Sequence, residues 1–357
     1  MRSCGGVEYM QLEITEPDDW HLHLRDGRAM ADVVGHSARS FARAVIMPNL
    51  QPPITTTGEA LAYRERIVSA LPEGLGFEPL MTLYLTDLTS RQEIARAADC
   101  AEVVGVKLYP AGATTNSEAG VTDIARALPI LAAMAEHEIP LLVHGEVTDS
   151  SVDIFDREKV FIDRVLAPLV EEVPGLRVVF EHITTGDAVA WILSAPPSVV
   201  ATITAHHLLL DRNAIFAGGL SPHHYCLPVL KRDRHREALL WAATSGNPRF
   251  FLGTDSAPHP RYLKQAAYGC AGIFSAHAAL ELYAEVFENA GALDRLEGFA
   301  SHFGADFYRL ARNNGRMTLV QEEWKVPETY TFGDHELVPL RAGEMVRWKV
   351  ADQGVLT

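Results

Sequence analysis

Eight apolar runs of strand length recur along the chain, and polar or turn residues follow each of them. Near-continuous apolar strands are typical of a parallel sheet that is covered on both faces. Helix-like segments lie between several of the runs, which favours repeated strand–helix units. Eight such units predict a closed (β/α)8 barrel of the TIM type rather than an open sheet. The predicted strands are Trp20–Leu24, Ala44–Met47, Pro79–Leu85, Val103–Tyr109, Pro140–Val143, Arg177–Ile183, Val199–Ile203 and Phe250–Gly253.

The spacing of apolar residues predicts helices in the intervals between these strands. No internal repeat, low-complexity tract or linker divides the chain, and little sequence precedes the first predicted strand. We therefore expect residues 1–357 to form one barrel domain, with residues 1–10 as a loose N-terminal tail and a mixed, Pro- and Gly-punctuated C-terminal segment. The predicted helices are Ala60–Leu71, Arg91–Cys100, Ile124–His137, Lys159–Val173 and, after the barrel, Ala276–Asn289.

The charge balance limits the partners of the chain. Its 31 basic and 46 acidic residues give a formal charge of −15, and no basic cluster interrupts the acidic composition. Such a chain is a poor ligand for nucleic acid or a membrane surface, so we expect neither partner. An anionic small molecule stays possible as substrate, because a metal ion or one arginine can reverse the field locally.

Four scattered cysteines form no CxxC pair, which argues against a structural zinc knuckle or a disulfide framework. Free thiols indicate a reducing cytoplasm. No apolar run reaches the roughly 18 residues of a membrane span, and the first ten residues lack the apolar core of a secretory signal. We therefore expect a cytoplasmic protein.

Residues with metal-binding capacity collect where the predicted strands end, which is where barrels carry their chemistry. His21 and His23 are two positions apart in an extended segment, so both imidazoles can face the barrel axis and share one metal. Each residue alone has an ordinary explanation: a strand-end histidine is more often structural, and Lys107 could be a snorkelling lysine. The combination from separate strands favours a metal site, made by His21, His23, Lys107, His144, His182 and Asp255.

The lysine has a chemical explanation. A protonated amine beside two divalent cations would be repelled, whereas a neutral amine can react with carbon dioxide to form a carbamate whose two oxygens bridge two metals. Nitrogen and carboxylate ligands with open positions suit catalytic zinc. We expect two divalent metal ions, most readily Zn²⁺, with His21, His23 and Asp255 on one ion, His144 and His182 on the other, and carbamylated Lys107 (N6-carboxylysine) between them.

The motifs around these residues resemble those of the dihydroorotases, in their shorter, single-domain bacterial form. The similarity runs from about Leu12 to Lys349, and all the expected ligand positions are filled. Segments that other cyclic amidohydrolases would not be expected to share make the resemblance more specific. The matching motifs occupy residues 21–26, 47–50, 105–110, 204–207, 222–228, 253–259 and 270–272.

The resemblance implies reversible conversion between N-carbamoyl-L-aspartate and L-dihydroorotate, a step of de novo pyrimidine (UMP) biosynthesis. A hydroxide that bridges the two metals would attack the ring amide carbonyl. Asp255 would take the proton and pass it to the leaving nitrogen, as general base and then general acid. The family also implies a homodimer.

The resemblance further implies a binding site for the small-molecule substrate and its unreactive carboxylate. A guanidinium fork suits a carboxylate, and Arg25 matches the residue that binds it, with two helpers. Two backbone positions would read the ring edges. The loop Ala111–Thr122 is small and polar, which is typical of loops that close over substrate, and two of its threonines would reach the ligand. The implied substrate-binding residues are Arg25, Asn49, Leu227, His259, Ala271, Thr114 and Thr115.

Two other functions stay open from the sequence. A ring-opening enzyme of the hydantoinase or allantoinase type would share the metal ligands, but its substrates lack the carboxylate that Arg25 and Asn49 would bind. A non-catalytic dihydroorotase-like partner subunit would typically have lost ligands. His206 and His207 are interpreted as supporting groups, and His223 and His224 receive no role.

Overall fold

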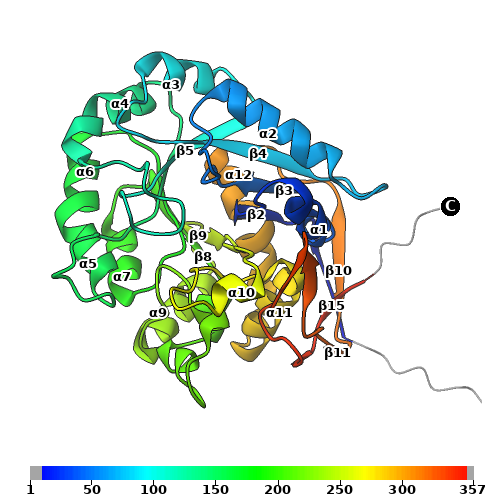
Figure 1. Cartoon of the computed structure of the whole chain (residues 1–357). Coiled ribbons are helices and arrows are strands. Elements are labelled where there is room, and N and C mark those ends of the chain that lie inside the picture. The colour runs from blue at the N-terminus through cyan, green and yellow to red at the C-terminus, as the bar shows by residue number, and fades with distance from the viewer. Residues whose placement is uncertain (1–9, 352–357) are drawn as a thin grey trace, which may run out of the picture.

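A computed structural model describes residues 10–351 and shows a barrel of eight parallel strands (Figure 1). Each predicted strand is confirmed, and no strand end differs from its prediction by more than three residues. The sheet runs in sequence order, and its first strand meets the segment that follows its last strand through a parallel bridge between Leu22 and Ser256. The strands are β2 (Asp18–Leu22), β3 (Arg43–Ile46), β4 (Glu78–Tyr84), β5 (Val103–Leu108), β6 (Leu141–Val143), β7 (Val178–Phe180), β8 (Val199–Ile203) and β9 (Phe250–Leu252).

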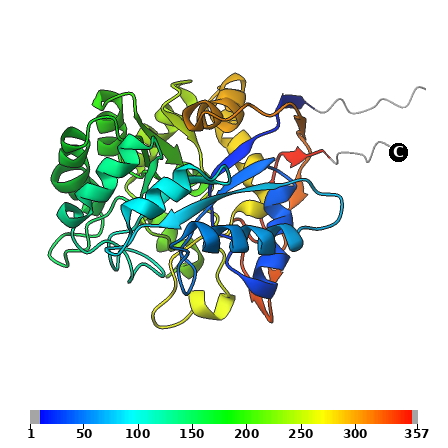
Figure 2. The ribbon, with the colours of Figure 1, turned by 90° about the horizontal axis from the view of Figure 1, so that it is seen from above.

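Helices surround the strands and cover the outer face of the sheet (Figures 1 and 2). The five helix predictions are confirmed in place, although the one over Lys159–Val173 is divided by a π-helical turn, η1 (Ile162–Leu166). The helices are α1 (Gly27–Ala38), α2 (Thr57–Ser69), α3 (Arg91–Ala98), α4 (Ile124–Glu136), α5 (Arg157–Phe161), α6 (Ala167–Glu172), α7 (Gly186–Ser194), α8 (Ala205–Leu209), α9 (Asp233–Thr244), α10 (Arg261–Lys264), α11 (Ala279–Asn289) and α12 (Phe303–Tyr308).

Several of these helices start at a side-chain cap that follows closely on a strand. Thr56 and Glu59 form a reciprocal capping box at the start of α2, and Thr185 and Thr204 cap α7 and α8. A capping oxygen satisfies an amide that the helix leaves unpaired, so the chain turns from strand to helix at a defined residue. Such turns fix where the strand-end side chains point.

The barrel has two apolar layers. Alternate strand residues point inward, where Val45, Val179 and Phe251 pack together, while their neighbours face the helices. Trp20 fills one end of this interior and stacks on Tyr308 of α12, with ring centroids 4.6 Å apart. Because apolar side chains fill that end, the polar strand-end residues gather at the opposite, carboxyl end.

Segments from both ends of the chain form small antiparallel sheets beside the barrel (Figure 2). The sequence analysis did not anticipate β1 (Gln11–Thr15), which pairs with β10 (Arg316–Val320), or the strands in the C-terminal segment. A strand whose partner lies some 300 residues away leaves no local signal. The remaining strands are β11 (Trp324–Lys325), β12 (Tyr330–Phe332), β13 (His335–Leu337), β14 (Met345–Val346) and β15 (Lys349–Val350).

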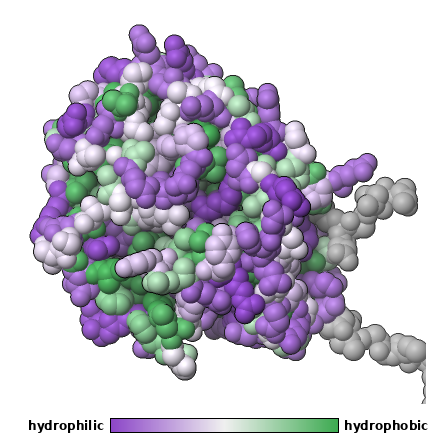
Figure 3. Space-filling model, in the orientation of Figure 1, coloured by the Kyte–Doolittle hydropathy of each residue, from purple (hydrophilic) through white to green (hydrophobic). Residues whose placement is uncertain are grey.

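The predicted loose tail falls largely outside the described residues, since only Met10 of residues 1–10 belongs to them. The Met10 carbonyl accepts a hydrogen bond from the Gln321 amide beside β10. Within residues 10–351, no helix combines the length and the apolar character that crossing a membrane requires. The face drawn in Figure 3 is mainly hydrophilic, with apolar residues in small groups.

A buried ion pair fixes the start of the barrel and yields the first prediction. Arg43 donates two hydrogen bonds to Asp18, at 2.9 and 2.6 Å, and both side chains are buried. We expect Arg43→Leu to lower the free energy of unfolding by about 3–5 kcal/mol, because Asp18 would keep a buried charge without its partner. Urea unfolding measures this loss.

The matched control is Arg28→Leu, which removes an ion pair to Asp334 between exposed side chains. It should change the free energy of unfolding by no more than about 1 kcal/mol. Equal effects of the two substitutions would contradict a structural role for the buried pair.

Candidate metal centre

Three predicted ligands form a compact triangle at the carboxyl end of the barrel. The Nε2 atoms of His21 and His23 lie 3.2 Å apart, and Asp255 Oδ1 lies 3.3 and 3.2 Å from them. All three side chains are buried. Donor atoms at the usual zinc distance of about 2.0–2.2 Å from one ion would be separated by roughly this much. The triangle therefore fits one divalent cation.

A buried carboxylate holds this triangle in place. Asp19 accepts hydrogen bonds from the His21 amide at 3.1 Å and from the amide and hydroxyl of Thr254 at 2.9 and 2.6 Å. The Asp255 amide in turn donates to the His21 carbonyl at 2.9 Å. Burial raises the pKa of Asp19 to about 7 in spite of these hydrogen bonds. Asp19 thereby joins the first barrel strand to the segment that carries Asp255.

A second group of possible ligands lies next to the first. His182, Glu181 and His21 are buried and offer ligand atoms within 4.8 Å of one another. Glu181 Oε1 lies 3.0 Å from His21 Nδ1, whereas His182 Nδ1 has no partner among the described residues. Burial lowers the pKa of His21 and His182 well below the usual range, so both rings are neutral, which is the form that binds metals.

His144 is close to this group but has another partner. The rings of His144 and His182 lie 5.0 Å apart between centroids. His144 Nε2 lies 2.9 Å from the Glu146 carboxylate, and both side chains are buried. The structure thus brings both predicted ligands of the second ion together, with the His144 nitrogen directed at Glu146.

Lys107 is wholly buried in β5, beside the second group. Its Nζ contacts the carboxylate of Glu181 and lies 4.8 Å from the centre of the Tyr109 ring. Burial lowers its pKa well below the usual range. Burial therefore favours the uncharged amine, which is the form that the predicted carbamate chemistry requires.

The centre opens into a small cavity at the barrel mouth. Among the predicted site residues, only Lys107 and His259 do not line it. The predicted residues that line the cavity are His21, His23, Arg25, Asn49, Thr114, Thr115, His144, His182, Leu227, Asp255 and Ala271.

Arg25 is held beside the metal triangle in an unusual conformation. Its φ of 66° is left-handed, a region that residues other than glycine rarely occupy. Its Nε donates to the Pro258 carbonyl at 3.0 Å, and its Nη2 lies 2.9 Å from His259 Nε2. Burial, followed by the charge of Arg25, lowers the pKa of His259, so its neutral ring accepts from the guanidinium. His259 thus orients the guanidinium of Arg25.

The loop Ala111–Thr122 lies across the mouth of the barrel. Asn49 donates from its amide to the Thr115 carbonyl at 3.1 Å, and Asn116 donates to the Asn49 carbonyl at the same distance. The Thr115 hydroxyl lies 3.4 Å from the Ala271 carbonyl. These contacts place Thr114 and Thr115 at the cavity.

Three further residues of the site had no role in the sequence analysis. Glu181 directly precedes the predicted ligand His182, and Glu146 lies two positions after His144. An acidic residue close to a strand-end histidine could therefore have identified both as site residues. Lys264 had no such signal. Its buried Nζ donates to the carbonyls of Tyr225 and Gly272 at 2.6 and 2.7 Å, and so it ties together the segments that carry Leu227 and Ala271.

The chain is similar to known proteins along nearly its whole length. Residues 18–319 match the Amidohydrolase family. A dihydroorotase of Nitrosomonas europaea is 66% identical over 96% of this chain and 98% of its own. The crystal structure of a Campylobacter jejuni dihydroorotase has a TM-score of 0.89 at 37% identity, over 97% of this chain and 98% of that one.

A Saccharomyces cerevisiae dihydroorotase, crystallised in complex with 5-fluoroorotic acid, has a TM-score of 0.88 at 34% identity. The alignment covers 96% of this chain and 98% of the yeast chain. The chain therefore belongs to the amidohydrolase family and, within it, to the dihydroorotases.

Proposed function

We propose that the chain catalyses the reversible conversion of N-carbamoyl-L-aspartate to L-dihydroorotate in pyrimidine (UMP) biosynthesis. One observation carries the proposal: a guanidinium, Arg25, faces the same cavity as the triangle of His21, His23 and Asp255. The first group recognises a carboxylate and the second fits a hydrolytic metal. A cyclic amide with a pendant carboxylate matches both.

Two Zn²⁺ ions are the proposed cofactors. His21, His23 and Asp255 would hold one ion, and His144 and His182 the other, with the carbamate of Lys107 between them. The burial of Lys107, which lowers the pKa of its amine, supports this modification, because only an unprotonated amine adds to carbon dioxide. When bound, the ions would activate water for attack at neutral pH and polarise the ring amide carbonyl.

Asp255 is the proposed proton carrier. Its carboxylate lies at the cavity and beside both histidines of the triangle. In the ring-opening direction it would take the proton of the attacking water and deliver it to the leaving ring nitrogen. In the biosynthetic direction it would first take a proton from the ureido nitrogen.

The remaining residues would bind and orient the ring. Arg25 would hold the carboxylate as a fork, with Asn49 and His259 as neighbours. Thr114 and Thr115 of the loop would approach the substrate, while the backbone of Leu227 and Ala271 would read the ring edges. The complex of the yeast relative with 5-fluoroorotic acid supports this assignment.

The two alternative functions are less favoured. High-identity relatives over nearly the whole chain are dihydroorotases rather than hydantoinases. A non-catalytic subunit would be expected to lack ligands, whereas every predicted ligand position is occupied. We further propose a single domain and a cytoplasmic homodimer. The location is supported by three free cysteines among the described residues.

The role of Asp255 is tested by Asp255→Asn. We expect kcat to fall by about 10²–10⁴-fold, because the amide cannot carry the proton. Metal content, measured by elemental analysis, should largely persist because His21 and His23 remain. Asp163→Asn, at an exposed ion pair, is the control and should keep full turnover. Near-normal activity of Asp255→Asn would end the mechanism.

The carbamate is tested by growing and purifying the protein with ¹³C-bicarbonate. A carbamate resonance should appear in the ¹³C NMR spectrum of the metal-loaded enzyme and be absent from Lys107→Met. Lys231→Met removes another buried lysine, whose Nζ donates to the Val229 carbonyl, and should keep the resonance. A spectrum of the active wild type without a carbamate signal would refute the modification.

Arg25→Met tests carboxylate recognition. We expect kcat/KM for dihydroorotate to fall by about 10–100-fold, the equivalent of losing hydrogen bonds to a charged group. Dihydrouracil, the same ring without the carboxylate, should lose no rate relative to the wild type. Arg28→Met, three residues along the chain and exposed, is the control. An equal loss on both substrates would show that Arg25 does not act on the carboxylate.

A further inference from the structure

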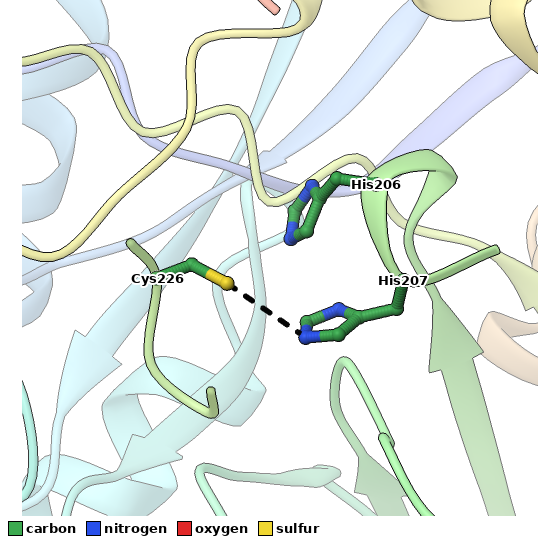
Figure 4. Close-up of side chains that lie close together, drawn as sticks. All are labelled: His206, His207 and Cys226. Atoms are coloured by element: carbon green, nitrogen blue, oxygen red, sulfur yellow. Dashed lines mark hydrogen bonds between the residues drawn. The ribbon is translucent and has the colours of Figure 1, made fainter. Parts of the chain in front are cut away.

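A second cluster of metal-binding side chains lies outside the cavity of the candidate centre. His206 and His207 belong to α8, and Cys226 precedes Leu227 on a separate segment (Figure 4). All three are buried, with exposed fractions of 0, 2 and 1%. Their ligand atoms lie within 4.8 Å of one another, and none of the three lines the cavity at the barrel mouth.

His206 is the most unusual member of the cluster. Both of its ring nitrogens are buried without a hydrogen-bond partner among the described residues. An unpaired buried polar group destabilises the folded chain, so such a ring is expected to have a partner that the polypeptide does not supply. In Figure 4 the His206 ring lies beside the His207 ring, and the Cys226 side chain points toward the two rings.

His207 can also direct the lone pair of a ring nitrogen into this cluster. Its Nδ1 lies 2.7 Å from the Thr204 hydroxyl, and its Nε2 lies 3.0 Å from the Pro228 carbonyl oxygen. If Nδ1 carries the proton and donates to Thr204, then Nε2 and the carbonyl oxygen face each other as two electron-pair donors. That tautomer is favourable only with a cation between them, and the Thr204 hydroxyl would then orient the ligand.

The donor separations suit a single ion. Cys226 Sγ lies 3.9 Å from His207 Nε2 and 3.4 Å from the Pro228 oxygen. Tetrahedral zinc with Zn–S of about 2.3 Å and Zn–N or Zn–O of about 2.0–2.2 Å separates its donors by roughly 3.3–3.6 Å. Small side-chain movements bring the observed distances into this range.

We propose that His206, His207, Cys226 and the Pro228 carbonyl form a third cation site, specific for a zinc-class ion. A thiolate with two imidazoles selects zinc over magnesium or calcium, which prefer oxygen ligands. Binding displaces the thiol proton. Four protein donors leave no open position, so the ion is structural rather than catalytic.

The site would act on substrate binding through the chain that it holds. Leu227 lies between two of the donors, Cys226 and Pro228, and it lines the cavity at the barrel mouth. The neighbouring Tyr225 carbonyl accepts from the Gly272 amide at 3.0 Å, next to Ala271. The ion would fix both segments. This consequence depends on the proposed function, whereas the site itself does not.

Cobalt substitution of the full-length protein tests the site. The barrel-mouth ligands offer only nitrogen and oxygen, so a thiolate-to-cobalt charge-transfer band in the near ultraviolet reports the cysteine site alone. We expect the band in the wild type, with three cobalt ions per chain. Cys226→Ser should lose the band and one ion, and His206→Gln should weaken this ion's binding by at least about 10-fold.

Cys100→Ser removes a half-buried thiol far along the chain and should leave the band intact. Circular dichroism and thermal unfolding establish that each variant is folded, and Cys226→Ala replaces Cys226→Ser if the latter is not. A wild type that saturates at two cobalt ions without the band overturns the proposal, as does a band that persists without Cys226. Dihydroorotate turnover by a two-cobalt enzyme would leave the proposed function untouched.

Discussion

The closure of the barrel by the Asp19 carboxylate is the interaction on which the candidate site depends. It accepts hydrogen bonds from the amide of His21 and from the amide and hydroxyl of Thr254, so the first strand and the segment after the last strand share one buried carboxyl group. An anion withdrawn from water is stable only when donors surround it, so this geometry has little freedom. Asp255 follows Thr254 directly, and its distance from the two histidines is set by this junction rather than by its own strand.

Strain at the strand ends accompanies this geometry. Arg25, His182 and Asp255 all have left-handed φ values, of 66, 42 and 45°. Each such residue costs of order 1–3 kcal/mol, and it persists only where surrounding contacts over-determine it. Burial of the ligands and the hydrogen bonds around Arg25 provide those contacts. Three residues of one cavity therefore hold backbone conformations that a free chain would avoid, as expected of a pre-formed binding site.

Neutral side chains are the electrostatic counterpart of this arrangement. Burial lowers the pKa of Lys107, His21 and His182, so it favours the uncharged forms of these side chains, which are electron-pair donors. The two buried ring nitrogens of His206, which have no hydrogen-bond partner among the described residues, support the third proposed ion in the same way.

The sequence by itself determined the eight strands, the barrel and the residues gathered at its mouth, because apolar runs and strand-end polar residues are local patterns. His21 and His23 were recognisable from their alternation alone. Tertiary structure decided the contacts that no short stretch of sequence can reveal. These are the pairing of β1 with β10, the contacts of Glu181 with His21 and Lys107, and the hydrogen bonds of Lys264. These join residues tens to hundreds of positions apart. These contacts stabilise the protein only when burial removes water from both partners, and burial is a property of the folded chain.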